Sequence, residues 1–428
     1  MSLYQATSTF VTAPYTQQAD GEEVIIGLPE QGIFLALPPD AVELIDQLRN
    51  GKTLGEAEAF YIAKYGEVPD SEGLIQALEQ RGFLRDAARA PVAKAPEAGE
   101  PRKAAPVRYH FAGFPQRLAQ RIFGTWAFAV YGLLVALAIA AVCVEPTILP
   151  RWSSLVVSRN MTATVLVLMV LSYVMLFLHE MAHLIAARAV GVSCRMGIGH
   201  RLWILVAETD MTGVWAIPRR QRYLPFLAGP ILDLVLAALL LLSLFASARG
   251  WVQLPPTGQW LLRASLIMLA FRMLWQFHFF LRTDFYCVFV TLFGCKNLMG
   301  DTEAFLKHSV RGLLRRPRQA GNPLDAVPPR ERPVIRAYAG FWVVGRAVAF
   351  IVLFGIQLPV VFAYVRSVVG VLSSPGDHFH MLVDALMLST LAVFTLGTGM
   401  FLWLRSLMRG RSARKSAASG LSPSVALE

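Results

Sequence analysis

The stretch Leu176–Ile185 (LFLHEMAHLI) carries the motif around which the rest of the chain is organised. His179 and His183 are four positions apart, so on a helix they stand on one face, one turn above the other. Two imidazoles at this spacing can bind one zinc ion, and Glu180 can accept a proton from a water bound to it. The surrounding segment, residues 162–187, is otherwise apolar and long enough to cross a bilayer. Ionisable side chains are costly there, which favours function over a chance His-Glu-x-x-His in a packed helix.

The composition is that of a membrane protein, with 55% hydrophobic and only 16% charged residues in a chain of 428. The cysteines are scattered without a C-x-x-C pair, which predicts neither a disulfide framework nor a zinc ribbon: Cys143, Cys194, Cys287 and Cys295. The N-terminal region is polar and has no signal-peptide pattern, and the first apolar span begins near Gly124. We therefore expect a soluble domain ahead of the membrane part.

Residues 21–85 are expected to form this small α+β domain, behind a flexible arm at 1–20. Two short strand patterns, at 23–27 and 32–37, are separated by a turn sequence. Three stretches with apolar residues at helical spacing follow them. The pattern predicts a compact α+β domain on the N-terminal side of the membrane helices.

This order of elements resembles the PqqD-like fold, a small winged-helix domain that recognises the leader peptides of ribosomally made, modified peptides. The resemblance rests on the strand pair, on residues 37–66 (LPPDAVELIDQLRNGKTLGEAEAFYIAKYG) and on the closing residues 74–84 (LIQALEQRGFL). It implies that the domain binds peptide by adding a strand to the sheet edge. The alternative is a generic helical cytosolic domain that packs on the membrane part.

Beyond a Pro/Ala-rich linker at 86–120, six apolar segments each approach the roughly 20 residues that cross hydrocarbon. They are residues 124–144, 162–187, 224–246, 260–281, 338–365 and 381–404. The sequence predicts a mainly α, polytopic bundle of about six transmembrane helices, with short strands in the loop 191–223. We divide it into a membrane core at 121–300, a basic cytoplasmic loop at 301–337, C-terminal transmembrane helices at 338–404 and a disordered basic tail at 405–428.

The distribution of positive charge predicts the orientation of these helices. Basic residues gather in one set of flanks, at 102–121, 188–222, 282–336 and 405–415. The loops on the other side hold only Arg151, Arg159, Arg249 and Arg366. The positive-inside rule places both termini in the cytoplasm, which suggests a bacterial inner or plasma membrane. The net charge of +11 is then explained by loops facing anionic lipid, and no nucleic-acid partner is expected.

A catalytic zinc site needs a third protein ligand besides the two histidines. Asp284 is the best candidate, because the second and fourth spans run in the same direction and place it at a depth similar to the histidines. Two alternatives remain. Glu208 lies at the distance typical of a thermolysin-like third ligand, and Asp284 would otherwise be an interfacial acid paired with Arg282.

The membrane part resembles the site-2-protease-like (M50) family of membrane zinc peptidases, and within it the peptide zinc metalloproteases fused to a PqqD-like domain. The resemblance rests on residues 179–183 (HEMAH), 228–233 (AGPILD) and 281–286 (LRTDFY). It implies that His179, His183 and Asp284 bind Zn2+ and that Glu180 is the catalytic base. It also implies that strands in the loop after the metal helix present substrate by β-pairing.

Three residues depart from the family pattern. Phe285 stands where Gly usually follows the ligand Asp, Asp233 where Asn is common, and His278 where an Asn commonly precedes the Asp motif. Asp233 and His278 are therefore candidates for contacts to the substrate or the oxyanion, and the sequence leaves open which residue stabilises that charge.

The expected activity is hydrolysis of a peptide bond by a zinc-activated water, with Glu180 transferring the proton. The substrate is expected to be a peptide or small protein recruited by the N-terminal domain, for the maturation or export of a ribosomal peptide. Two alternatives remain open. One is a non-catalytic binding or export-accessory protein with a vestigial metal site, and the other is a regulatory intramembrane protease of a signalling protein.

Overall fold

The computed structural model describes residues 4–87, 113–151, 154, 161–295, 297–314 and 321–359, with single residues and short runs between 362 and 408. The chain divides into two compact units. Among the described residues, the first unit comprises 4–87 together with Met211–Arg222, and the second comprises 113–210 and the residues from Tyr223 onward. The predicted linker lies largely outside the described residues, as does most of the predicted C-terminal tail.

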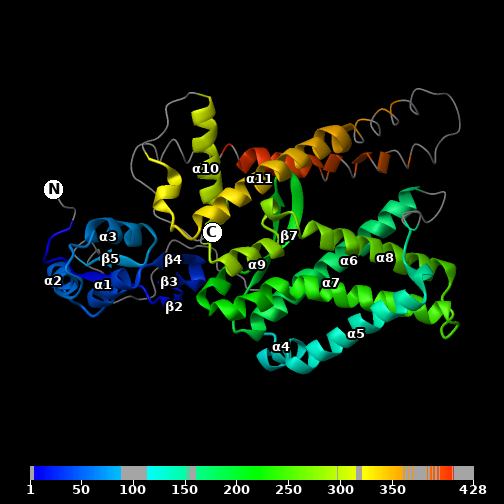
Figure 1. Cartoon of the computed structure of the whole chain (residues 1–428), viewed down its shortest axis with the longest axis horizontal. Coiled ribbons are helices and arrows are strands. Elements are labelled where there is room, and N and C mark those ends of the chain that lie inside the picture. The colour runs from blue at the N-terminus through cyan, green and yellow to red at the C-terminus, as the bar shows by residue number, and fades with distance from the viewer. Residues whose placement is uncertain are drawn as a thin grey trace. The chain divides into compact units, whose positions relative to one another are not determined.

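The first unit combines short antiparallel sheets with three helices (Figure 1). Its strands are β1 (Phe10–Thr12), β2 (Thr16–Asp20), β3 (Glu23–Leu28), β4 (Ile33–Leu37) and β5 (Leu84–Asp86). Its helices are α1 (Pro39–Arg49), α2 (Leu54–Tyr65) and α3 (Ser71–Gln80). The sheet order is β2-β3-β4, and β1 pairs with β5. The small sheet region expected from the sequence is therefore present, whereas its winged-helix character stays a prediction.

The expectation of a flexible arm at residues 1–20 is wrong, because β1 and β2 lie within this range. Phe10 is 6% exposed and packs in the core of this unit, and β2 pairs along its length with β3. The sequence did not reveal this strand, because four of the five residues of TQQAD are polar and leave no alternation of apolar and polar side chains.

The face of the β2-β3-β4 sheet is covered in part by a segment from far along the chain. The short helix η4 (Thr212–Ala216) contacts all three strands. Trp215 and Ala216 pack against Ile25 of β3 and Phe34 of β4. This contact explains why residues 211–222 group with the N-terminal domain.

The second unit is mainly helical. Before the metal motif it holds α4 (Gln116–Ile122), α5 (Thr125–Val144) and the turn η2 (Pro146–Ile148). The elements that surround the motif are α6 (Met161–Ala189), β6 (Arg195–Arg201), β7 (Ile204–Asp210), α7 (Arg219–Ala248), α8 (Pro256–Trp275), η5 (Phe279–Leu281) and α9 (Asp284–Phe293). After them follow α10 (Leu298–Leu313), η6 (Pro323–Ala326), α11 (Arg332–Val352) and a π-helical turn at Leu353–Gln357.

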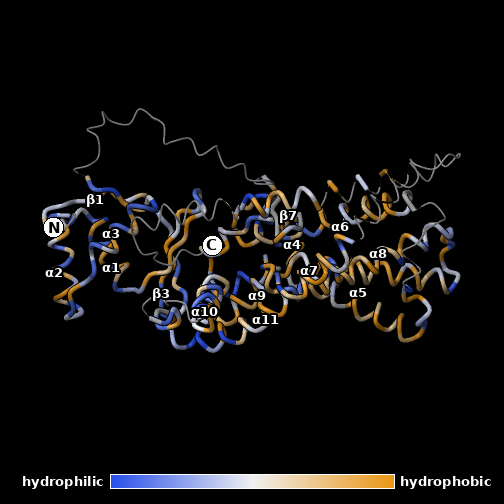
Figure 2. Tube along the Cα trace, turned by 90° about the horizontal axis from the view of Figure 1, so that it is seen from above, coloured by the Kyte–Doolittle hydropathy of each residue, from blue (hydrophilic) through white to orange (hydrophobic). Residues whose placement is uncertain are grey.

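Four of these helices are long and apolar enough to cross a membrane: Gln116–Val144, Thr164–Ala189, Arg219–Ala248 and Arg332–Gly355. Figure 2 shows the hydrophobic colour running along the long helices of this unit, including α5 and α7. The chain is therefore an integral membrane protein, and the predicted count of six spans is not reached by the described residues. The fourth predicted span differs: its helix ends at Trp275, before the η5 turn, and it is not among these four. Of the sixth, at 381–404, the described residues are helical, including the run 396–404, and the others lie outside the described residues.

Small residues let the helices around the motif approach closely. Ala182 and Ala186 of α6 pack against Ala228 of α7, and all three are at most 6% exposed. The strands predicted in the loop after α6 form the β6–β7 hairpin. Leu202 and Trp203 at its tip pack in one cluster with the η5 turn. The hairpin is thereby fixed beside α6 and η5.

Candidate metal centre

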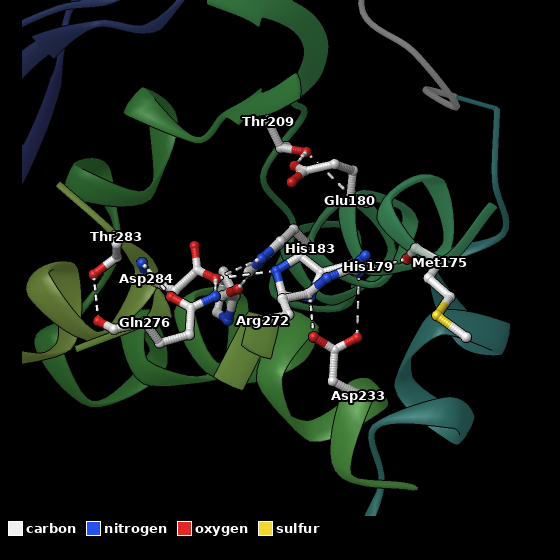
Figure 3. A network of polar contacts seen from close by, with 11 residues as sticks. Met175, His179, Glu180, His183, Thr209, Asp233, Arg272, Gln276, Thr283 and Asp284 are labelled. Atoms are coloured by element: carbon white, nitrogen blue, oxygen red, sulfur yellow. Dashed lines mark hydrogen bonds and ion pairs between the residues drawn. The ribbon is translucent and has the colours of Figure 1, made fainter. Parts of the chain in front are cut away.

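Three side chains from different parts of the second unit converge on one point (Figure 3). His179 and His183 come from α6, and Asp284 is the first residue of α9. Asp284 Oδ2 lies 3.1 Å from His179 Nε2 and 3.3 Å from His183 Nε2. A tetrahedral zinc shell with bonds of about 2.0–2.2 Å has neighbouring ligand atoms roughly 3.3 Å apart. The separations from the carboxylate are therefore those of ligands that share one metal ion.

The tautomer of both histidines follows from their other ring nitrogen. His179 Nδ1 lies 2.9 Å from Asp233 Oδ2, and His183 Nδ1 lies 2.7 Å from the carbonyl oxygen of Pro225. A carboxylate and a carbonyl only accept hydrogen bonds, so each Nδ1 carries the proton and donates it. In the neutral form of each ring, Nε2 then presents a lone pair, as metal ligation requires.

Two further observations fit a metal ion at this point. His183 is 1% exposed, and within the described residues its Nε2 has no hydrogen-bond partner. A Cβ on Gly229 of α7 would lie 2.4 Å from the Nε2 atoms of both His179 and His183. Glycine therefore leaves open the space between the two Nε2 atoms.

Gln276, the residue at the C-terminal end of α8, orients the carboxylate. Its Nε2 donates to Asp284 Oδ2 at 2.8 Å, and its Oε1 accepts from the backbone N–H of Asp284 at 3.1 Å. The Thr283 hydroxyl donates to the Gln276 carbonyl at 2.6 Å, which ties the end of α8 to the start of α9. An anionic side chain at a helix N-terminus is also favoured by the helix dipole. The position of Asp284 is thus set by the turn that carries it.

Glu180 faces the β6–β7 hairpin. The Thr209 hydroxyl of β7 donates to Glu180 Oε2 at 2.7 Å, and Glu180 is 7% exposed (Figure 3). Thr209 is paired with Met196 in the hairpin register. A buried carboxylate next to the converging ligands, oriented by one hydroxyl, can accept a proton from a water between it and a metal ion.

The structure separates the other sequence candidates. Asp233 of α7 contacts Nδ1 of His179, on the other side of the ring from Asp284. His278 stacks on Trp275 and contacts the Trp275 carbonyl and the Phe280 ring, and no contact joins it to the three converging ligands among the described residues. Glu208 lies on β7 opposite Gly197, and the metal-ligand cluster found among the described residues does not include it.

Three residues of this site escaped the sequence analysis: Thr209, Arg272 and Gln276. Arg272 of α8 donates to the carbonyls of Met175 at 2.8 Å and Ser172 at 3.4 Å, both on α6. A charged residue within an apolar helix was the signal that would have found it. Gln276 and Thr209 carry no such signal, because their role depends on a turn and a hairpin that place them.

A bundle of apolar helices around two histidines, an aspartate and a neighbouring glutamate is typical of a membrane metallopeptidase. Residues 165–421, more than half of the chain, match the family model described as Peptidase family M50, and the chain belongs to that family. Its members are membrane metallopeptidases that depend on zinc. No curated protein and no solved structure matches the chain. The family match does not reach the N-terminal domain, whose PqqD-like character stays a prediction.

Proposed function

We propose that this protein is a membrane-embedded zinc endopeptidase in which His179, His183 and Asp284 hold the metal and Glu180 is the general base. The convergence of the two unprotonated Nε2 atoms and one carboxylate oxygen carries this proposal. Gly229, which keeps the space between them open, supports it. Zinc bound there would polarise the scissile carbonyl and lower the pKa of its water to about 7.

Glu180 performs the proton transfer in this proposal. Its carboxylate accepts a proton from the attacking water and delivers it to the leaving amine. The Thr209 hydroxyl occupies Glu180 Oε2 and so leaves Oε1 to face the water. The surrounding apolar helices limit the entry of bulk water, which strengthens these interactions.

The test compares the purified full chain with Glu180→Gln and Asp284→Ala. One zinc per chain in the wild type and in Glu180→Gln, together with peptide-bond cleavage only in the wild type, is the expected result. Zinc bound normally by Asp284→Ala would move the third ligand elsewhere, with Glu208 examined next. Failure of the wild type to bind zinc after reconstitution would favour the non-catalytic accessory protein.

We also propose that the N-terminal domain recruits the substrate peptide, such as the leader of a modified ribosomal peptide. Two observations support this. β2 has β3 on one side and, within the described residues, no strand on the other, so an extended peptide has an edge to pair with. The segment that packs on the sheet, Met211–Arg222, directly follows the strand that bears Thr209.

The recruitment proposal is tested in cells with the Glu180→Gln variant, which would retain uncleaved substrate. Peptides that copurify are identified by mass spectrometry, with Gln17→Pro and Gln18→Pro as edge variants. One of these two prolines removes an outward N–H from β2, and that variant is expected to lose the peptide. Retention of the same peptide by both would point to recruitment by the membrane part, as in a regulatory intramembrane protease.

We further propose that both termini face the cytoplasm of a bacterial inner membrane. The excess of Lys and Arg in one set of loops supports this orientation. Reporter fusions at the N-terminus and after Arg249 test it, since they are expected to report opposite sides of the membrane.

A further inference from the structure

Asp233 lies at the centre of a buried polar network behind the metal ligands. It is 2% exposed, and its two oxygens face different partners. Oδ2 accepts from His179 Nδ1 at 2.9 Å, and Oδ1 lies 3.5 Å from Arg272 Nη1. A carboxylate at such a position is costly unless a cation and hydrogen bonds compensate its charge. The network supplies both.

Arg272 connects three helices at this point. From α8 it reaches Asp233 of α7 and the Met175 and Ser172 carbonyls of α6. Met175 lies four residues before His179, which is one helical turn. The guanidinium therefore holds Asp233 to the turns of α6 that precede His179.

We propose that Asp233 and Arg272 form a positioning pair that fixes the His179 ring as a metal ligand. Asp233 accepts the hydrogen bond from Nδ1–H and so directs the Nε2 lone pair to the metal. Arg272 neutralises Asp233 and keeps its carboxylate aimed at the ring. The inference rests on the proposed zinc site and adds to it two charged residues, Asp233 and Arg272, behind the ligand His179.

The chemistry of the pair distinguishes it from a pair that only stabilises the bundle. An asparagine at the position of Asp233 would differ from the aspartate in charge. An amide oxygen can accept the Nδ1–H, but it cannot neutralise a buried guanidinium. The charge of Arg272 on α8 is therefore matched by an aspartate, and not by an asparagine, on α7. The hydrogen bond from Nδ1 to an anion also increases the basicity of Nε2.

The test measures zinc affinity of the full chain in detergent by competition with a chelator. Asp233→Ala is expected to weaken zinc binding by about 10- to 100-fold, the range for removal of a residue that orients a metal-binding histidine. Asp233→Asn, which keeps an acceptor for Nδ1, is expected to recover part of that loss. Arg263→Gln is the matched control: Arg263 lies nine residues earlier on α8, and within the described residues it joins none of these contacts.

Arg272 is tested by a double-mutant cycle with Asp233→Asn and Arg272→Gln. If Arg272 holds the carboxylate in place, Asp233→Asn costs less zinc affinity in the Arg272→Gln background than in the wild type. Additive effects would overturn the role of Arg272. Unchanged zinc affinity in Asp233→Ala would overturn the proposal for Asp233 while leaving the zinc site intact.

A second readout covers the case in which Asp233→Ala fails to fold. The d–d absorption bands of the cobalt(II)-loaded wild type are compared with those of Asp233→Asn. The bands are expected to shift, because the donor strength of His179 changes, whereas Arg263→Gln leaves them in place. Identical spectra for Asp233→Asn and the wild type would contradict the inference. A wild type that binds neither zinc nor cobalt would overturn the proposed function itself, and the inference with it.

Discussion

Each of the two units holds an arginine at the centre of a polar network, Arg222 in the first and Arg272 in the second, and the two networks differ in kind. Arg222 in the first unit is 1% exposed. It donates to Asp20 at 2.7 Å and to the carbonyls of Ile217 at 2.9 Å and Trp215 at 3.3 Å, with its guanidinium over the Trp215 ring. Within the described residues, none of the side-chain atoms in this network is buried without a hydrogen-bond partner. Arg222 therefore fastens a segment to the sheet.

The network of Arg272 in the second unit does not end in this way. From Asp233 it continues through the His179 ring to Nε2, which faces the carboxylate of Asp284, and the Nε2 of His183 faces the same carboxylate. A structural network and a network built around a ligand therefore differ. The first satisfies all its members, and the second leaves lone pairs gathered at one point.

The largest effect on the rate of the chemical step is expected from a substitution of Glu180. Glu180→Gln keeps the size of the side chain and its contact with Thr209 but cannot accept a proton. Peptide-bond cleavage should fall by about 10²- to 10⁴-fold, the usual contribution of a general base, with zinc content unchanged. Single-turnover cleavage by the purified protein measures this, and cleavage near the wild-type rate would remove Glu180 from the mechanism.

Gly229→Ala tests whether the space between the Nε2 atoms of His179 and His183 is a metal site. The added Cβ would lie 2.4 Å from both histidine Nε2 atoms, so zinc binding and cleavage should both be lost. Gly132→Ala on α5 is the matched control, because a Cβ there meets no atom within 4 Å and alanine favours helix. Zinc retained at full occupancy by Gly229→Ala would show that the metal lies elsewhere.

Arg222→Met should loosen the first unit and leave the metal centre as it is. The change removes hydrogen bonds of a buried cation, worth about 2 kcal/mol. We expect faster hydrogen exchange in β2 and in Met211–Arg222. Arg195→Gln is the comparison, since the Arg195–Asp210 pair at 2.8 Å is half-exposed and such pairs contribute little. Equal exchange in the two variants would mean that Arg222 does not fasten the segment.

The smallest effect concerns the start of α2. Thr53 accepts from the backbone N–H of Glu56, and the Glu56 carboxylate accepts from the N–H of Thr53, which lowers the pKa of Glu56. Thr53→Ala should cost about 1 kcal/mol, seen as faster exchange in the first turn. Because the folded pKa of Glu56 lies below the unfolded one, its contribution is present above the unfolded value and fades as pH falls through the folded one. Exchange insensitive to Thr53→Ala would contradict the capping role.

Much of this architecture follows from sequence because it rests on local patterns. Apolar runs predict the long helices, the four-residue spacing of His179 and His183 predicts their common face, and equal depth in parallel spans led to Asp284. The strand β2 was missed, since its polar residues gain their order only by pairing with β3. Gln276 and Thr209 were missed for a similar reason. Their partners are 8 and 29 residues away in sequence and meet them only through a turn and a hairpin.

The measurement that tests the central claim most directly is the metal content of the purified full chain, wild type beside Asp284→Ala. We expect about one zinc per chain in the wild type and its loss in the variant, because Asp284 is the carboxylate that lies next to both histidine Nε2 atoms. Equal zinc in the two proteins, or none in the wild type after reconstitution, would contradict it.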